Sequence, residues 1–302
     1  MIFTRTRRVI IGAGLAVGIS LSAGMAGNAP ASAEASVDYQ LLWSQNFDTK
    51  KIMLPNKKLW NLERGTGANG ELQYSMPSIG NVSTDGKGHL LIKAQRISDM
   101  SMNETTNNPA DWKILDACGT CQFKSGRMNS AGKVGFKYGR IEGRIRVAEG
   151  VGTWPAFWML GYDGQQWPDC GEIDIVETRG YMDNVAFGTI HGPGYSGGNG
   201  RGSVFDNVKP LSKWYHTYAI DWTPDKIVFS VDYQPYFTVE PMDVTPNEWA
   251  YNNREFYLIA NLAMGGEFTG EIDPKVNKAQ MSIDYIKYYS INGVGKVLKH
   301  YK

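Results

Sequence analysis

The stretch RIEGRIRV, which spans Arg140 to Val147, decides the fold class because apolar and charged side chains alternate along it. In an extended chain, successive side chains point to opposite faces, so Ile141 and Ile145 share one face with Val147. The arginines and the glutamate lie on the other face. Alternation with a period of two predicts a β-strand with one face buried and one face in solvent.

The chain on both sides of this strand continues as short β-rich runs separated by turns. Clusters such as Asp85–Gly88 and Gly192–Gly194 separate the runs, and no stretch of ten or more residues has a convincing helical period. With 35 glycines and 13 prolines, the sequence predicts an all-β fold, closed as a β-sandwich or jelly roll. Strands are expected at residues 90–94, 185–190, 215–222, 227–232, 256–263 and 281–289, with a polar tail at 292–302.

The N-terminus has the pattern of an export signal. A basic segment at 5–8, with three arginines, precedes an apolar stretch at 9–21, and Ala31-Ser32-Ala33 has the small side chains of a cleavage site. The apolar stretch is shorter than the roughly 20 residues that cross a bilayer, which disfavours a retained anchor. We therefore expect a signal peptide at 1–33, by the general or the twin-arginine route, and a single secreted domain at 34–302 with no membrane partner.

Charge and cysteine content exclude some function classes. The formal net charge is +1 and no basic run follows the signal, so we expect no nucleic-acid partner. The three cysteines are Cys118, Cys121 and Cys170, an odd number. Cys118 and Cys121 are separated by two residues, a spacing that also occurs in zinc sites. The sequence has no second cysteine pair of this spacing and no nearby histidine, so a zinc site is disfavoured. A local disulfide and two unpaired thiols both stay open.

The segment DCGEIDIVE, residues 169–177, carries the most chemistry. On a strand, Glu172 and Asp174 share a face, whereas Glu177 would point into the core unless a one-residue β-bulge near Val176 turned it back. Three neighbouring carboxylates repel one another, so at least one should titrate at high pH, as general acid catalysis requires. A retaining glycosidase needs two carboxyl groups about 5 to 5.5 Å apart, and this row can supply them. The alternative is a solvated acidic strand edge.

Aromatic and basic residues near this segment are candidates for sugar binding. Trp154 and Trp158 share one strand face with the small Ala156 between them, which leaves a slot that a pyranose ring could enter. Ordinary core packing is the alternative for both indoles. Arg144 could bind a sugar hydroxyl or lie on the surface, and His191 opens a glycine-rich loop without a metal or triad partner in the sequence.

The segment EIDIVE resembles the signature of glycoside hydrolase family 16, in the variant with one extra residue before the last glutamate. Further blocks resemble the bacterial laminarinase branch of endo-1,3-β-glucanases and cover about residues 42–289 in order. They are NGELQY at 69–74, YGRIEGR at 138–144, WPAFWMLG at 154–161, HGPGY at 191–195 and NLAMGG at 261–266. The resemblance implies a jelly roll with a long substrate cleft across its concave sheet.

The resemblance also implies roles for residues. Glu172 matches the nucleophile, Glu177 the acid/base and Asp174 the carboxylate that assists the nucleophile. The positions that match the family's substrate subsites are Asn69, Arg144, Trp154, Trp158 and His191. The family often holds a structural calcium ion, for which Asp284 matches the side-chain ligand and Gly88 is the candidate carbonyl ligand. No cofactor is expected for catalysis.

These observations lead to the hypothesis of a secreted, endo-acting, retaining 1,3-β-glucanase that acts as a monomer on a β-glucan. Alternatives within the family are a mixed-linkage 1,3-1,4-β-glucanase and a β-galactan hydrolase. A glucan-recognition protein without activity is the alternative from another class, but such relatives typically lose one or both glutamates, and both are present here. The sequence leaves the preferred linkage open.

Overall fold

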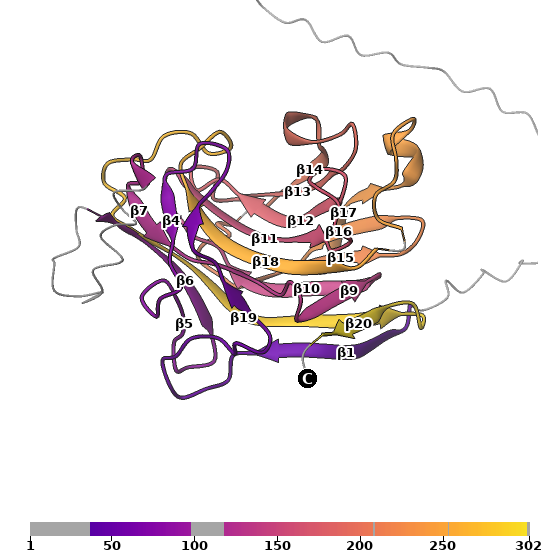
Figure 1. Cartoon of the computed structure of the whole chain (residues 1–302), viewed down its shortest axis with the longest axis horizontal. Helices are drawn as coiled ribbons and strands as arrows, with labels where there is room; N and C mark the ends of the chain where they lie inside the picture. Colours follow the sequence, from indigo (N-terminus) through magenta and orange to yellow (C-terminus); the bar gives the residue numbers. More distant parts are fainter. Residues whose placement is uncertain (1–36, 98–117, 208, 253, 301–302) are drawn as a thin grey trace, which may run out of the picture. The chain divides into compact units, whose positions relative to one another are not determined.

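Two largely antiparallel β-sheets form most of the regular structure in this computed structural model, which describes residues 37–97, 118–207, 209–252 and 254–300 (Figure 1). The first sheet runs, in spatial order, β17 (Gln234–Val239), β16 (Ile227–Val231), β15 (His216–Trp222), β10 (Gly139–Arg146), β19 (Lys278–Ile291), β6 (Leu90–Arg96), β7 (Phe123–Ser125), β4 (Gln73–Ser75) and β3 (Gly65–Thr66). In addition, β1 (Tyr39–Asn46) pairs with β19, and β5 (Val82–Thr84) pairs with β6.

The second sheet lies against the first. Its spatial order is β14 (Arg201–Asp206), β13 (Val185–His191), β12 (Glu172–Thr178), β11 (Thr153–Gly161), β18 (Phe256–Met264), β8 (Arg127–Asn129) and β2 (Asn61–Leu62). Beside β18, β9 (Val134–Lys137) pairs with β20 (Lys296–Lys299). The fold is the predicted all-β jelly-roll sandwich.

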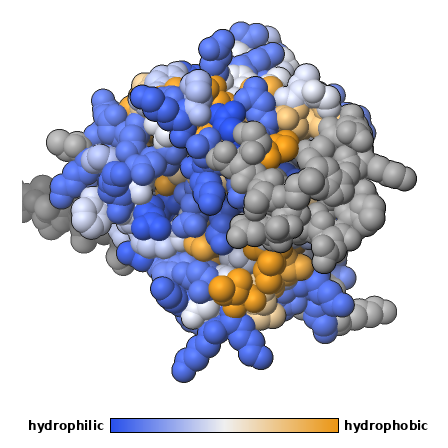
Figure 2. All heavy atoms as spheres, turned by 90° about the vertical axis from the view of Figure 1, so that its left-hand side faces the viewer, coloured by the Kyte–Doolittle hydropathy of each residue, from blue (hydrophilic) through white to orange (hydrophobic). Residues whose placement is uncertain are grey.

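The hydrophobic core lies between the two sheets and consists of the apolar side chains on their facing sides. On β10, Ile141 and Ile145 are fully buried, as their alternation predicts, and Phe157 of β11 is equally buried on the opposite sheet. Burial of such side chains is the main favourable term in folding. On the side of the molecule drawn in Figure 2, hydrophilic side chains predominate and hydrophobic ones gather in small patches.

The expected strands are all present, with small shifts at their ends. One expectation is wrong, because the predicted polar tail contains β20, which pairs with β9. This strand has only four residues, so its alternation is too short to detect, and its pairing with distant β9 creates it. The predicted signal peptide, residues 1–33, lies outside the described residues. Within the described part of the chain, no helix has the length and hydropathy to cross a membrane.

Candidate active site

Strand β12 presents three carboxylates on the outer face of the second sheet because a β-bulge interrupts its register. The pairing with β11 skips Ile175, which is the extra residue, and both Ile175 and Val176 are buried. The bulge therefore returns Glu177 to the face that carries Glu172 and Asp174, as predicted. We call these three residues the carboxylate row.

Glu172 lies at the start of the row, beside an indole that the sequence analysis did not select. Trp167, in the loop between β11 and β12, donates its Nε1 hydrogen to the Glu172 carboxylate, and its own ring is half exposed. Burial and the charge of Asp174 raise the pKa of Glu172 to about 8, while His191 and the Trp167 hydrogen bond oppose that rise. Both opposing contacts favour the ionised carboxylate.

Asp174 is the central and most buried member of the row, with 3% of its surface exposed. Its Oδ2 lies 3.2 Å from Nε2 of His191, which projects from the neighbouring strand β13. Burial and the charge of Glu177 raise the pKa of Asp174 well above its usual value, and a hydrogen bond with Glu172 opposes the rise. Because the charges interact closely, the three carboxyls titrate as one system.

Glu177 lies at the other end of the row and accepts a hydrogen bond of 2.7 Å from Nε1 of Trp154 on β11. Burial raises the pKa of Glu177 to about 7, and the Trp154 hydrogen bond is the largest opposing effect. In register, Glu177 pairs with Phe187 of β13, so a phenylalanine is its neighbour on that strand. The row thus contains a carboxyl that can hold a proton near neutral pH.

The two tryptophans of β11 lie on the carboxylate face and are held by polar contacts. The Trp154 ring packs on Phe268 at 4.9 Å between centroids. Trp158 donates its Nε1 hydrogen to Asn261 of β18 at 2.7 Å, and the guanidinium of Arg127 lies 4.9 Å from its ring centroid. The indoles are therefore part of the site. The Trp158 ring, which was predicted to stack on a sugar, is in contact with the guanidinium of Arg127.

Two other predicted residues lie near the row or its rim. His191 contacts Asp174 as described. Asn69 is exposed in the loop after β3, and its main-chain oxygen accepts a hydrogen bond of 2.9 Å from Glu267. That bond attaches the Asn69 loop to the segment just after β18, which also carries Phe268. This places Asn69 at the Trp154 end of β11, because Trp154 pairs with Ala263 of β18.

Arg144 lies elsewhere, and the expectation that it lines the substrate site is wrong. It belongs to β10 of the first sheet, and its neighbour Ile145 points into the core between the sheets. Arg144 therefore points outward, away from the second sheet, where it pairs with Asp284 and stacks on Tyr215 at 5.0 Å. The sequence showed that Arg144 is on a polar face but not which sheet that face belongs to.

The predicted calcium ligands fit a metal ion only in part. The carboxylate of Asp284 is already paired with Arg144. Gly88 forms a β-bridge with Phe47, next to Asp48. Calcium takes six to eight oxygen ligands, and the described residues contain no group of three or more acidic, histidine or cysteine side chains placed to bind a metal. A calcium ion at Asp284 would therefore depend on main-chain oxygens and would compete with Arg144.

Several residues of the site were not among the predicted site residues. Trp167 lies in a loop, and Arg127, Asn261 and Phe268 come from segments far from the carboxylate row in the chain. Arg127 is held by an ion pair of 2.9 Å with Glu63, so a second distant segment positions it. Only the pairing of β11 with β18, and of β18 with β8, brings them together.

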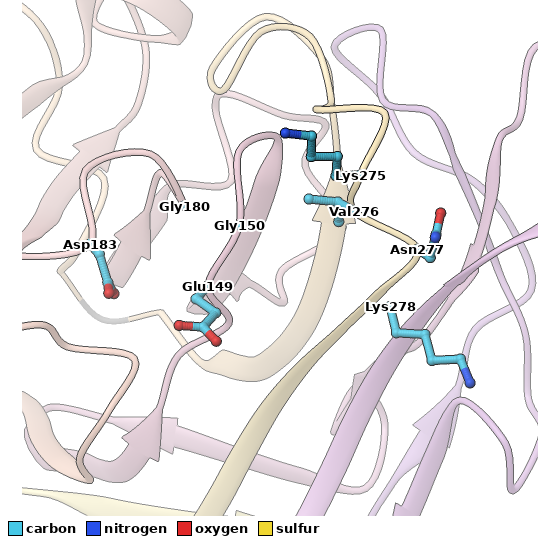
Figure 3. A pocket seen from close by; sticks show the side chains of 8 residues that line it. All are labelled: Glu149, Gly150, Gly180, Asp183, Lys275, Val276, Asn277 and Lys278. Atoms are coloured by element: carbon cyan, nitrogen blue, oxygen red, sulfur yellow. The ribbon is translucent and has the colours of Figure 1, made fainter.

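Two further features lie outside the carboxylate row. Cys118 and Cys121 form a disulfide, which settles the alternative that the sequence left open, and Cys170 is a buried free thiol. A cavity of about 590 Å³ is lined by Glu149, Gly150, Gly180, Asp183 and residues 275–278 (Figure 3). Its two carboxylates already have partners, since Lys213 pairs with Glu149 and Ser212 donates to Asp183. None of the predicted site residues lines it.

Known proteins share the sequence and the fold of this chain. A β-glucanase of Rhodothermus marinus is 33% identical over 266 residues, covering 83% of this chain and 85% of the relative. The laminarinase catalytic domain of Thermotoga maritima superposes with a TM-score of 0.72 at 35% identity, covering 84% of this chain and 98% of that one. A variant of a non-specific endo-β-1,3(4)-glucanase, crystallised with 1,3-β-D-cellobiosyl-glucose at its active site, superposes with a TM-score of 0.71 at 30% identity, covering 87% and 98%.

The family description "Glycosyl hydrolases family 16" matches residues 79–287, a span that contains the whole carboxylate row. The relatives of this protein that are named as glucanases and laminarinases match most of its length. They support the cleavage of internal bonds in a glucan. The chain is a glycoside hydrolase and belongs to family 16.

Proposed function

We propose that this protein is an exported, endo-acting, retaining glucanase that cleaves internal 1,3-β-glucosidic bonds of laminarin-type glucans. The observation that carries the proposal is the carboxylate row. Its members share one outer face of the second sheet, their pKa values are raised by burial, and each end of the row receives an indole hydrogen bond. Perturbed carboxyls of this kind are typical of general acid catalysis.

In the proposed mechanism, Glu172 attacks the anomeric carbon and Glu177 donates a proton to the leaving oxygen. The bond to the leaving sugar breaks as the bond to Glu172 forms, which gives a covalent glycosyl-enzyme. Glu177, now ionised, then takes a proton from water, and that water displaces Glu172. Two inversions at the same carbon leave the product with the β configuration of the substrate.

The active form of the row has Glu172 ionised and Glu177 protonated. Taken one at a time, the pKa values of about 8 and 7 would place the proton on Glu172 first. However, a proton on Glu177 removes its negative charge from the row, which favours the ionised form of Glu172. His191 and the Trp167 indole support the ionised form of Glu172 in the required arrangement.

The similarity to laminarinases supports a 1,3-β-glucan as substrate, and the relative with a bound mixed-linkage oligosaccharide makes mixed-linkage glucan the second candidate. The test measures reducing ends released from laminarin, barley mixed-linkage glucan, agarose and a 1,3-β-galactan. We expect the fastest release from laminarin, with products of several lengths as endo cleavage requires. No release from any polymer would contradict the proposal.

The hydrogen bond from Trp154 to Glu177 gives a prediction for pH dependence. Because this bond favours the ionised carboxylate, Trp154→Phe should raise the pKa of Glu177. A general acid must be protonated, so the basic limb of the kcat/KM profile on laminarin should move to higher pH. Since the lost bond also orients the acid, kcat should fall about tenfold. Unchanged limbs and an unchanged kcat would show that the indole neither tunes nor positions Glu177.

Export and calcium binding extend the proposal. Cleavage after Ala33 predicts a secreted chain that begins at Glu34, which N-terminal sequencing of culture supernatant would check.

If calcium binds at Asp284 in the folded state only, the melting temperature should be higher in excess calcium than in EDTA, because a ligand of the native state stabilises it by mass action. The rate on laminarin should change little at temperatures well below melting. Equal melting temperatures would rule out a structural calcium ion.

A further inference from the structure

Arg179 lies just beyond the carboxylate row and makes contacts that the mechanism above does not use. It directly follows the last residue of β12, and two aromatic rings beside the row hold its guanidinium. The carbon atom Cζ of its guanidinium lies 4.2 Å from the ring centroid of Phe268 and 4.8 Å from that of Phe187. Arg179 therefore joins β12, β13 and the segment after β18.

Two rings, Phe268 and Trp154, connect Arg179 to the proposed general acid Glu177. Phe268, on which the guanidinium stacks, packs in turn on Trp154 with 4.9 Å between ring centroids. Phe187 meets Phe268 edge-on at 5.2 Å and closes the group. Trp154 then donates its Nε1 hydrogen to Glu177 at 2.7 Å. The rings of this stack thus determine where the indole hydrogen points.

The position of Arg179 depends on these rings more than on polar partners. Its Nε is buried and has no hydrogen-bond partner among the described residues. Its Nη1 donates to the hydroxyl of Tyr181 at 3.3 Å, and Arg179 forms no ion pair with a carboxylate among the described residues. The positive charge is therefore not neutralised by a close acidic partner, and it acts on Glu177.

The other charged groups around Glu177 are accounted for. Glu172 and Asp174 lie on its own strand, and His191 projects from β13 beside Asp174. From β11, Glu177 receives only the neutral indole of Trp154. The segment that carries Phe268 also carries Glu267, whose side chain is exposed. Arg179 is thus the arginine that acts on the acid end of the row.

We propose that Arg179 is a positioning residue, which holds Phe268 against Trp154 so that the indole hydrogen stays directed at Glu177. The inference rests on the proposed role of Glu177 as general acid. Stacking of a guanidinium on aromatic faces is attractive and geometrically selective, so loss of Arg179 frees the Phe268 segment. A general acid that is misplaced by a fraction of an ångström transfers its proton poorly, although substrate still binds.

The test compares Arg179→Gln, Arg179→Lys and wild type on two substrates, laminarin and a 2,4-dinitrophenyl β-laminaribioside, whose leaving group needs little protonation. For Arg179→Gln, kcat on laminarin should fall about 10- to 100-fold while KM changes less than about threefold. On the dinitrophenyl substrate, kcat/KM, which reports formation of the glycosyl-enzyme, should fall less than about threefold. The basic limb of kcat/KM on laminarin should move to higher pH, because loss of a nearby cation raises the pKa of Glu177.

Two further variants make the result specific. Arg179→Lys keeps the charge but loses the planar stack, so kcat on laminarin should still fall, and the basic limb should move less than in Arg179→Gln. Phe268→Leu keeps Arg179 but breaks the contact with Trp154, so it should give the same dependence on leaving group. If the arginine variants fail to fold, Phe268→Leu still tests whether the stack on Trp154 is needed for proton transfer.

Arg146→Gln is the matched control, because Arg146 stacks on Tyr215 at 5.4 Å on the first sheet, away from the row. It should leave both rates unchanged. An equal loss on both substrates, or a raised KM with unchanged kcat, would overturn the inference in favour of a structural or a binding role. If wild type releases no sugar from laminarin but hydrolyses another polymer, the proposed substrate fails, and the same comparison on that polymer still decides the role of Arg179.

Discussion

Glu172→Ala should abolish hydrolysis of laminarin, with kcat lowered at least about 10⁴-fold, equivalent to about 5 kcal/mol of lost transition-state stabilisation. The reason is that alanine has no nucleophile to form the glycosyl-enzyme, and water cannot easily reach the face of the sugar that Glu172 occupies. The measurement is release of reducing ends at an enzyme concentration high enough to detect residual turnover.

External azide provides the sharper test of this role. Azide is small enough to enter the space that the Glu172 carboxylate leaves, so it should restore part of the turnover and give an α-glycosyl azide. In wild type, proton NMR at early times should show the β-anomer of the product first. If the α-anomer appears first, the enzyme inverts configuration, and Glu172 is not the nucleophile.

Glu149→Ala is a suitable control for Glu172→Ala, because Glu149 is a glutamate that pairs with Lys213 outside the carboxylate row. Exposed ion pairs contribute little to stability, so this variant should fold and keep a rate within about twofold of wild type. A similar loss in both variants would indicate a general effect on folding, which circular dichroism would detect.

Glu177→Ala should lower kcat on laminarin about 10²- to 10⁴-fold, the usual contribution of a general acid. In this variant, Glu172 can still attack, so the loss depends on how much help the leaving group needs. A dinitrophenyl β-laminaribioside should still form the glycosyl-enzyme quickly, and the intermediate should then accumulate because no base activates water. Azide should attack this intermediate and give a β-glycosyl azide.

The two azide products distinguish the two glutamates. An α-glycosyl azide from Glu177→Ala would exchange the roles assigned to Glu172 and Glu177. Equal losses of kcat/KM on laminarin and on the dinitrophenyl substrate would show that Glu177 contributes to binding or structure but not to proton transfer. The dependence on pH should change too, since removal of the acid removes the basic limb of the kcat/KM profile.

The sequence alone was sufficient for the longer strands and for the carboxylate row, because both depend on neighbours in the chain, whereas the short β20 was missed. The alternation in β10 indicates a half-buried strand whatever lies across from it. The spacing of Glu172 and Glu177 required a bulge, and the cost of burying an unpaired charge made that bulge the expected solution. The calcium site and the export signal depend on family resemblance and local pattern, and both stay predictions.

Tertiary structure decided which residues surround the row and what each one does. Arg144 was on the correct kind of strand face, but only the sheet order shows that this face belongs to the first sheet. Trp154 became a hydrogen-bond donor to Glu177 through the pairing of β11 with β12. Arg127 and Phe268 are distant in sequence from the row, and long-range strand pairing places them beside Trp158 and Trp154. A local pattern specifies the period of a strand, whereas the partner of a strand depends on packing between segments far apart in the chain.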